Sequence, residues 1–140
     1  MQKFFSNLLL VAVSSGLFSS LVRAEVSFEK QVKPILESAC LSCHGEKKPK
    51  GDLAFHTHEA LLEGEVVVAG KPEDSTLYTT TILPPDADEV MPPKPPFLSK
   101  IQTDVLKEWI LDGAKWPEGV VLKQVRRINF LKDIKPLLEG

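Results

Sequence analysis

Apolar residues in the first third of the chain follow the spacing of a helix with one buried face. After Ser27, which suits the N-cap position, apolar side chains recur three and four positions apart. The positions on this face are Phe28, Val32, Ile35, Leu36 and Ala39. The spacing predicts a helix from Phe28 toward Ala39, and we expect Pro34 to bend it or to shift its start.

A second helical pattern lies between Ser99 and Gly113. Ser99 suits the N-cap, and Gln102 stands at the position that completes a capping box. The expected buried stripe consists of Ile101, Val105, Leu106, Trp109 and Ile110. Gly113 suits the position just after the last turn, and Pro117 prevents the helix from resuming.

Between these helices the pattern predicts short elements and one long irregular loop. Residues 58–63 read as a short helix that ends at Gly64, and residues 66–69 as a strand or an extended loop. A further short helix is expected from Pro72 toward Ile82, although three consecutive threonines disfavour it. Residues 83–96 are rich in proline, which predicts an irregular loop with a function.

Residues 1–24 have the composition of a signal peptide. Lys3 supplies the positive start, residues 8–13 are apolar, and residues 22–24 end with small or modest side chains at the two positions that a signal peptidase reads, Val22 and Ala24. The alternative is an uncleaved anchor, but the apolar stretch is short of the ~20 residues that span a bilayer. We expect cleavage and export to the periplasm or cell envelope.

Length and charge exclude several classes of protein. The 140 residues suffice for one domain. The whole chain has 17 basic and 19 acidic side chains, and loss of Lys3 and Arg23 with the signal peptide increases the acidic excess. This balance gives no reason to expect binding to nucleic acid. We also expect no transmembrane span in the mature chain, because no other stretch is sufficiently apolar.

The two cysteines carry the most specific chemistry in the sequence. Cys40, Cys43 and His44 form a Cys-x-x-Cys-His motif, the attachment pattern of c-type haem. Two thiols one helical turn apart can add to the two vinyl groups of a porphyrin, and the next residue can present an imidazole to the iron. The motif predicts haem c as the cofactor, bound through Cys40 and Cys43 and ligated by His44.

Three other interpretations of the motif remain open from the residues alone. A thioredoxin-like dithiol needs its cysteines at the start of a helix after a strand, whereas here they follow a helix. Zinc could be held by both cysteines with two of His44, His56 and His58. A local disulfide beside an incidental histidine is the third alternative.

Met91 is the candidate for the second axial ligand of the iron. It is the only methionine besides Met1, and it lies inside the proline-rich loop. Prolines stiffen the loop and reduce the entropy lost in holding the sulfur against a metal. His/Met ligation is common in cytochromes c, whereas a methionine that fills a gap in the core is the alternative. His56 and His58 are competing ligands, for which we expect a solvated or capping role instead.

Residues 28–37 are partly repeated in residues 130–139. The two segments share phenylalanine, two lysines, proline, leucine and glutamate in the same register. Coincidence between two amphipathic helices is the alternative explanation. We interpret residues 119–140 as a linker and the start of a truncated second repeat, after a domain that comprises residues 25–118.

These motifs, in this order, resemble the planctomycete-type cytochrome c domain over about residues 26–118. The matching segments include Cys40-Leu-Ser-Cys43-His44-Gly45, Lys50-Gly51-x-Leu53, Gly70-x-Pro72-x-x-Ser75-x-Leu77, Met91-Pro92-Pro93 and Trp109-Ile110-x-x-Gly113-Ala114-x-Trp116-Pro117. The family often has an Arg-Leu-Asp-like stretch where this chain has residues 54–56.

The resemblance implies an all-α, small cytochrome c-like fold around one covalently attached haem, with a long proline-rich distal loop. It implies that His44 is the proximal ligand, that Met91 is the distal ligand, and that the first and last helices cross. We expect Leu53, Trp109, Ile110 and Trp116 to be wall residues of the haem site.

The function expected from these residues is single-electron transfer to redox partner proteins, without catalysis by the chain itself. The alternatives are an electron-relay module of a larger enzyme and a zinc-binding module.

Overall fold

The computed structural model describes residues 25–47, 49–125 and 130–139. The expected signal peptide, residues 1–24, lies outside the described residues. Within the described part every regular element is helical, which confirms the all-α prediction. No helix in these ranges is both long enough and apolar enough to cross a membrane.

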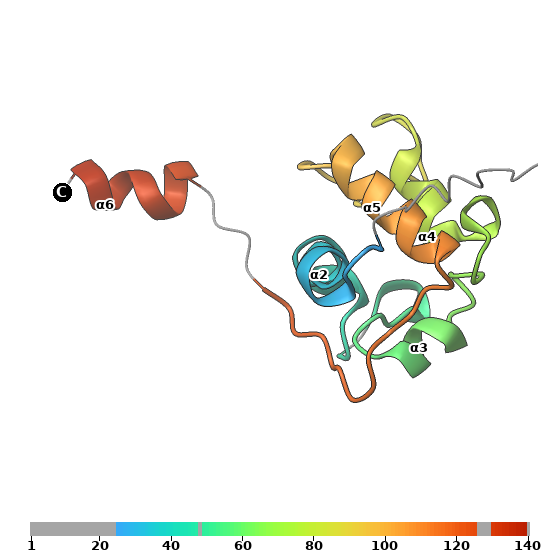
Figure 1. Cartoon of the computed structure of the whole chain (residues 1–140). Coiled ribbons are helices and arrows are strands. Elements are labelled where there is room, and N and C mark those ends of the chain that lie inside the picture. Colours follow the sequence, from blue (N-terminus) through green and yellow to red (C-terminus); the bar gives the residue numbers. More distant parts are fainter. Residues whose placement is uncertain (1–24, 48, 126–129, 140) are drawn as a thin grey trace, which may run out of the picture.

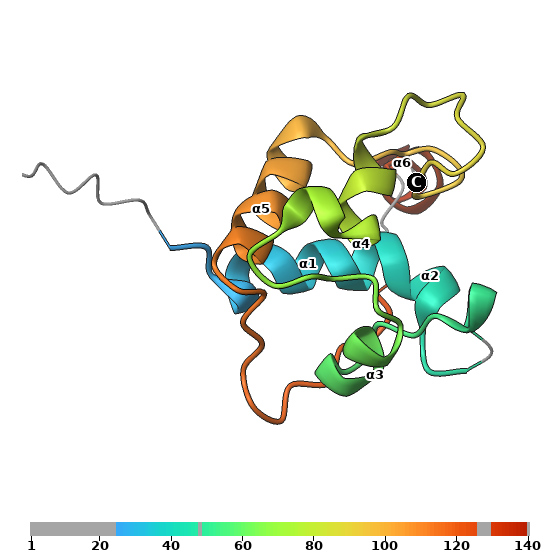
Figure 2. The same cartoon turned by 90° about the vertical axis from the view of Figure 1, so that its right-hand side faces the viewer.

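The first helical segment runs without a break from Phe28 to His44 and carries the cysteine motif in its last two turns (Figure 2). It comprises the π-helical η1 (Phe28–Val32), α1 (Lys33–Ile35), the π-helical η2 (Leu36–Cys40) and α2 (Leu41–His44). We call this segment the motif helix. As predicted, Ser27 caps it, because its side chain accepts a hydrogen bond from the backbone N–H of Lys30.

Pro34 lies in α1 and does not shift the start of the motif helix. Proline has no N–H and its ring crowds the preceding turn of an α-helix. Here the preceding turn is the wider π form, in which the N–H of Lys33 donates to the carbonyl of Phe28, five residues back. The widened turn therefore keeps the chain helical through the proline.

The middle of the chain consists of short helices, as the sequence predicted. The elements are the 3₁₀ turn η3 (Lys50–Asp52), α3 (His58–Glu63), the 3₁₀ turn η4 (Pro72–Asp74), α4 (Thr76–Thr79) and the 3₁₀ turn η5 (Thr80–Ile82). Gly64 ends α3 as expected. Of the two expectations for residues 66–69, the extended loop is correct, and Val66 and Val67 are buried in the core.

Helix α5 (Lys100–Leu111) closes the domain and has the expected capping box between Ser99 and Gln102. Leu106, Trp109 and Ile110 are buried, but Ile101 is 76% exposed. The prediction that Ile101 belongs to the buried stripe is therefore wrong. At about 100° per residue, Ile101 points about 180° away from Ile110, so a stripe drawn in steps of four drifts off the packed face.

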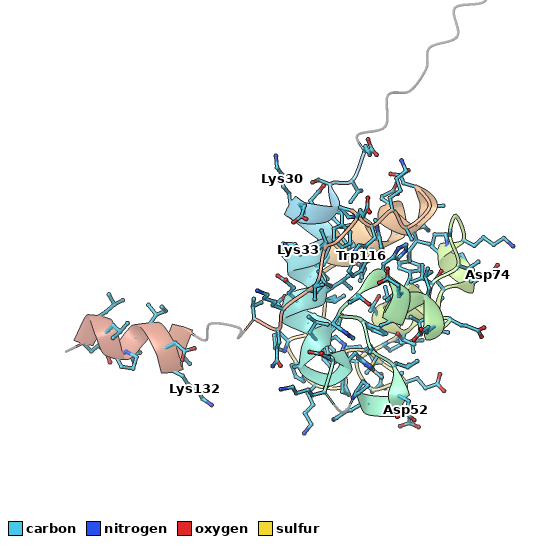
Figure 3. All side chains as sticks on the ribbon, turned by 90° about the horizontal axis from the view of Figure 1, so that it is seen from below. Lys30, Lys33, Asp52, Asp74, Trp116 and Lys132 are labelled. Atoms are coloured by element: carbon cyan, nitrogen blue, oxygen red, sulfur yellow. The ribbon has the colours of Figure 1, made fainter. Side chains whose placement is uncertain are left out.

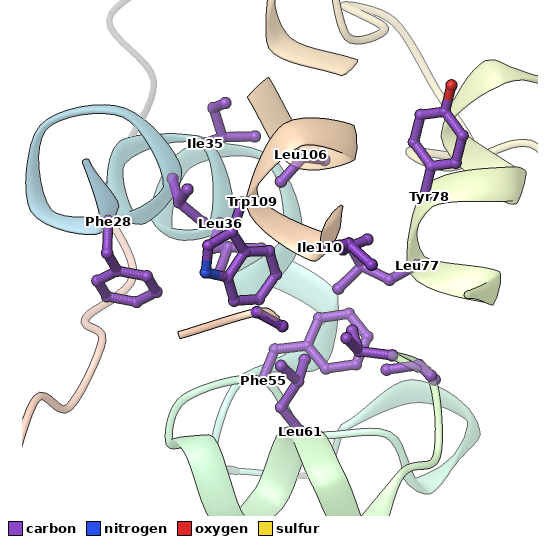
Figure 4. Close-up of a cluster of buried hydrophobic side chains, with 14 of the residues drawn as sticks. Phe28, Ile35, Leu36, Phe55, Leu61, Leu77, Tyr78, Leu106, Trp109 and Ile110 are labelled. Carbon is purple, nitrogen blue, oxygen red and sulfur yellow. The ribbon is translucent and has the colours of Figure 1, made fainter. Parts of the chain in front are cut away.

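The core forms where α5 crosses the motif helix (Figures 1 and 4). The rings of Phe28 and Trp109 pack with their centroids 6.0 Å apart, and Val32 and Leu36 are fully buried on the same face of the motif helix. Trp109 also donates from Nε1 to the carbonyl of Lys115, 2.8 Å away. This crossing, which the resemblance implied, fixes α5 against the first turns of the motif helix.

The chain continues from α5 into two further parts. Residues 118–125 pack against the domain, and Leu122 belongs to the core with 3% exposure, although we expected a linker from residue 119. A separate helical segment follows, made of the π-helical η6 (Phe130–Ile134) and α6 (Lys135–Glu139).

Candidate functional site

A cavity of about 730 Å³ opens beside the last turns of the motif helix. Cys40, Cys43 and His44 line it from that helix, and Met91 lines it from the proline-rich loop. The sequence-predicted residues therefore meet at one cavity, although they come from separate parts of the chain. Its volume lies within the ~300–1,000 Å³ that is usual for sites of small molecules and cofactors.

The helical backbone places both cysteines on the cavity side. Cys40 ends η2 and Cys43 lies in α2, so three positions of helix separate the thiols and bring them to one face. Both side chains are partly buried, and they are not joined by a disulfide. Two thiols on one wall of a cavity can bind one cofactor at two points.

His44 is held by a hydrogen bond that defines which ring nitrogen carries its proton. Its Nδ1 lies 2.9 Å from the carbonyl oxygen of Leu53. Because a carbonyl can only accept, Nδ1 must donate, and in the neutral tautomer with this bond the lone pair is on Nε2. In histidines that ligate metals, a hydrogen bond from the ring nitrogen that does not bind the metal fixes the orientation of the ring and raises its basicity. The imidazole is thus prepared to bind a metal through Nε2.

Phe55 supports the other side of the imidazole. Its ring stacks on that of His44 with a centroid distance of 4.6 Å and an interplanar angle of 14°. The backbone N–H of Phe55 donates to the carbonyl of His44 at 2.7 Å. Residues 53–55 therefore fix both the ring and the backbone at the end of the motif. No sequence signal identifies the role of Leu53, because every residue has a carbonyl.

Gly45 allows the chain to turn directly after the histidine. A Cβ atom placed on Gly45 would lie 2.8 Å from the carbonyl oxygen of Leu41, which is too close for ordinary packing. Its backbone has φ −82° and ψ −177°, a conformation that any residue can adopt. Glycine is therefore required here by the close approach of the two backbones, not by its conformational freedom.

The proline-rich loop is irregular, as predicted, and brings Met91 to the cavity. The backbone N–H of Met91 donates to the carbonyl of Thr80 at 3.0 Å, which ties the loop to η5. Pro92, Pro93, Pro95 and Pro96 also line the cavity. In Figure 2 this loop, in yellow and light orange, rises above the end of the motif helix. The side chain of Met91 is 37% exposed, so the cavity opens to solvent on this side.

His56 and His58 do not line this cavity. The ring of His58 stacks on Trp116 at 5.7 Å, which occupies one of its faces. Within the described residues, no three side chains of histidine, cysteine, aspartate or glutamate are grouped so that they could hold a metal ion. The set of zinc ligands considered from the sequence is therefore not assembled in this structure.

The apolar wall of the cavity differs from the expected one. Leu53 lines it as predicted, but Trp109, Ile110 and Trp116 do not, because the crossing of α5 with the motif helix takes them into the core. The residues that take their place are Phe55, Val66, Leu77, Leu98 and Leu106.

A part of the chain matches a known family model. Residues 40–95 match the family model described as Planctomycete cytochrome C, a range that contains both cysteines, His44 and Met91. No curated protein and no solved structure gives a significant match. A cytochrome c domain implies covalently bound haem c with its iron. The residues fit that group, since the cavity offers two thiols on one helix face, an imidazole with a free Nε2, a thioether and an apolar wall.

Proposed function

We propose that this protein carries single electrons and that its haem iron has His/Met axial ligation. The premise is the match of residues 40–95 to a cytochrome c domain of the planctomycete type, whose cofactor is haem c. Haem c supplies an iron that accepts and releases one electron between its ferric and ferrous states. The observation that carries the proposal is the meeting of Cys40, Cys43, His44 and Met91 at one cavity.

In this proposal each of the four residues has a separate task. Cys40 and Cys43 form the thioether bonds, His44 binds the iron through Nε2, and Met91 provides the sulfur ligand. The hydrogen bond from His44 to Leu53 supports the assignment of His44 as an iron ligand, since it leaves Nε2 available. Met91 lines the cavity wall and His56 and His58 do not, which supports the assignment of Met91 as the other iron ligand.

The apolar wall excludes water and helps to set the reduction potential. Phe55, Leu77 and Leu106 are each at most 6% exposed and line the cavity. An apolar surrounding disfavours additional charge on the iron and so favours the ferrous form, as does a soft sulfur ligand. We therefore expect a higher potential than bis-histidine ligation would give.

Export to the periplasm or cell envelope is also part of the proposal. The composition of residues 1–24 supports it, and covalent attachment of haem outside the cytoplasm is consistent with it. The partners are then redox proteins of the same compartment. The chain has no need of a catalytic site of its own, because electron transfer transforms no substrate.

A haem stain on a denaturing gel tests the proposal directly. The mature protein is produced in cells that attach haem to exported proteins, with Cys40→Ser/Cys43→Ser as the matched variant. We expect a stained band for the wild type and none for the variant, because only thioether bonds survive denaturation. A colourless wild-type band would overturn the proposal.

A second candidate, a relay module with more than one haem unit, is favoured by the C-terminal helix. Residues 130–139 repeat residues 28–37, and both segments change from π-helix to α-helix at the same position of the repeat, before the shared proline. Ile35 and Leu36 are buried in the core of the domain, whereas their counterparts Leu137 and Leu138 are 78% and 72% exposed. An exposed apolar face of this kind is suited to pack against a second helix equivalent to α5.

The count of haem groups per chain distinguishes the two candidates. For a relay module, mass spectrometry of the protein from its native cells should find two covalent haem groups per polypeptide. The gene should then encode a second Cys-x-x-Cys-His motif in frame after residue 139. One haem per chain and no second motif would leave the single carrier and rule out the relay module.

A further inference from the structure

Residues 118–125, which we call the C-terminal strap, fold back across the base of the domain. Figure 1 shows the strap, in orange, running beneath the helices, and in Figure 3 it follows the helix that carries Lys30 and Lys33. The indole Nε1 of Trp116 donates to the carbonyl of Val120 at 2.9 Å, which stabilises the turn into the strap. The family match ends at residue 95, so this segment lies outside it.

Hydrogen bonds donated by backbone N–H groups of the strap attach it on both sides of the cysteine motif. The N–H of Leu122 donates to the carbonyl of His56 at 2.7 Å, after the motif in the chain. The N–H of Lys123 donates to Oε1 of Glu37 at 3.0 Å, before the motif. With Leu122 buried to 3% exposure between these points, the strap is fixed to the domain as a part of its core.

The end of the strap forms a part of the cavity wall. Gln124 and Val125 line the same cavity as Cys40, Cys43 and Met91. The N–H of Val125 lies 3.4 Å from the carbonyl of Glu37, in the turn of helix before Cys40. The strap thus covers the cavity at the edge where the two thiols lie.

From this placement we propose that the C-terminal strap is a positioning element of the haem site, which shields the thioether edge from water and raises the reduction potential. The inference depends on the proposed function, because it requires haem in the cavity. Its physical basis is that solvent exposure of a haem stabilises the ferric form, which carries the additional charge. Leu122 anchors the strap, and Gln124 and Val125 provide the cover.

The first test removes the anchor from the haem-loaded protein. We expect Leu122→Ala to loosen the strap and to lower the midpoint potential. At a fixed solution potential the ratio of oxidised to reduced protein should rise on the order of tenfold, which corresponds to about 59 mV for one electron. The matched control is Val121→Ala, since Val121 is 54% exposed on the same strap and does not line the cavity.

Hydrogen exchange shows whether the strap has moved. In the wild type we expect slow exchange at the amides of Leu122 and Lys123, and in Leu122→Ala fast exchange. If these amides lose protection while the potential stays at the wild-type value, the strap is only a structural anchor and the inference is wrong. The proposed function would still stand in that case, because the haem stain tests it separately.

A second pair of variants tests the same inference without removing a core side chain. Gln124 is exposed to solvent at the cavity wall, so a change of charge there has little effect on folding. We expect Gln124→Glu to lower the potential and Gln124→Lys to raise it, because charges near the iron favour the oxidation state of opposite sign. Leu111→Glu, on an exposed position that does not line the cavity, serves as control. Equal potentials for both Gln124 variants would overturn the inference.

Discussion

Met91 differs from the other proposed haem residues because it reaches the cavity from a loop. Replacement by alanine removes the thioether but leaves the helices unchanged. We expect Met91→Ala to lower the reduction potential and to abolish the sulfur-to-iron absorption at the red edge of the oxidised spectrum, because a soft ligand of the ferrous iron is lost. Ile101→Ala is the control, since Ile101 is 76% exposed and does not line the cavity. An unchanged spectrum would show that sulfur does not bind the iron.

Gly45 allows a specific test of the turn after His44. The Cβ of an alanine at this position would collide with the carbonyl of Leu41, so the turn must shift. We expect Gly45→Ala to lower the free energy of unfolding of the holoprotein by about 1–3 kcal/mol in a denaturant titration, and to alter the haem spectrum.

Gly51→Ala provides the comparison for that variant. Gly51 has a φ of +64° and open space around its Cβ position. Alanine there should cost stability through backbone conformation alone, with the haem spectrum unchanged. If both variants leave the spectrum unchanged, the turn at Gly45 does not position His44.

The sequence predicted the cavity residues that have specific chemistry, but not most of the apolar wall and not the residues that act through the backbone. Cys40, Cys43 and His44 were predicted because their chemistry and spacing are specific. The carbonyl of Leu53 and the close approach at Gly45 were not, because any residue offers a carbonyl and many glycines are only flexible. Only the folded chain shows where two backbones meet.

Among the helices, α5 was predicted with its caps because the signals for both ends are local. The side chain of Ser99 accepts from the N–H of Gln102, and the side chain of Gln102 accepts from the N–H of Ser99 at 2.9 Å. We expect Ser99→Ala to lower the free energy of unfolding by about 1 kcal/mol, measured by denaturant titration.

The same titration of Ile101→Ala serves as the control for the cap. Because Ile101 is exposed in the first turn, its loss should change stability by at most about 0.5 kcal/mol. A larger loss for Ile101→Ala than for Ser99→Ala would mean that the side chain is packed. The prediction that Ile101 is buried was wrong because periodicity gives a direction around the helix axis, whereas burial depends on which element lies opposite.

The π turns of the motif helix could not be predicted from the pattern. Proline at position 34 indicated a disturbance, and the expected outcomes were a bend or a later start. The structure instead widens η1 and η2 on either side of α1, and the helix continues into the cysteines. The choice depends on packing, because Val32, Ile35 and Leu36 stay buried only if the helix remains continuous.

For the whole molecule, the sequence predicted the fold class but not the course of the chain after Pro117. Residues after 118 contain no regular helical pattern before the repeat, which favoured a linker. Leu122 is one buried side chain in an extended segment, and the bonds that hold the strap are formed by backbone N–H groups. Val120, Val121 and Leu122 are consecutive apolar residues, so no period in the pattern distinguishes the buried Leu122 from the exposed Val121.

The cavity also determines how the domain depends on its cofactor. Without haem, the space of about 730 Å³ between the motif helix and the proline-rich loop lacks the apolar cofactor that would fill it, and the side chains of its wall lose those packing contacts. Domains of this size are stable by only about 5–15 kcal/mol. We therefore expect Cys40→Ala/Cys43→Ala, made without haem, to lose cooperative unfolding and near-ultraviolet circular dichroism while it keeps a part of its helicity. Ser42→Ala, between the two cysteines, should unfold cooperatively as the holoprotein does. A sharp unfolding transition in the haem-free variant would show that the polypeptide alone maintains the cavity. The porphyrin would then bind to an already folded domain and would not be required as a part of its core.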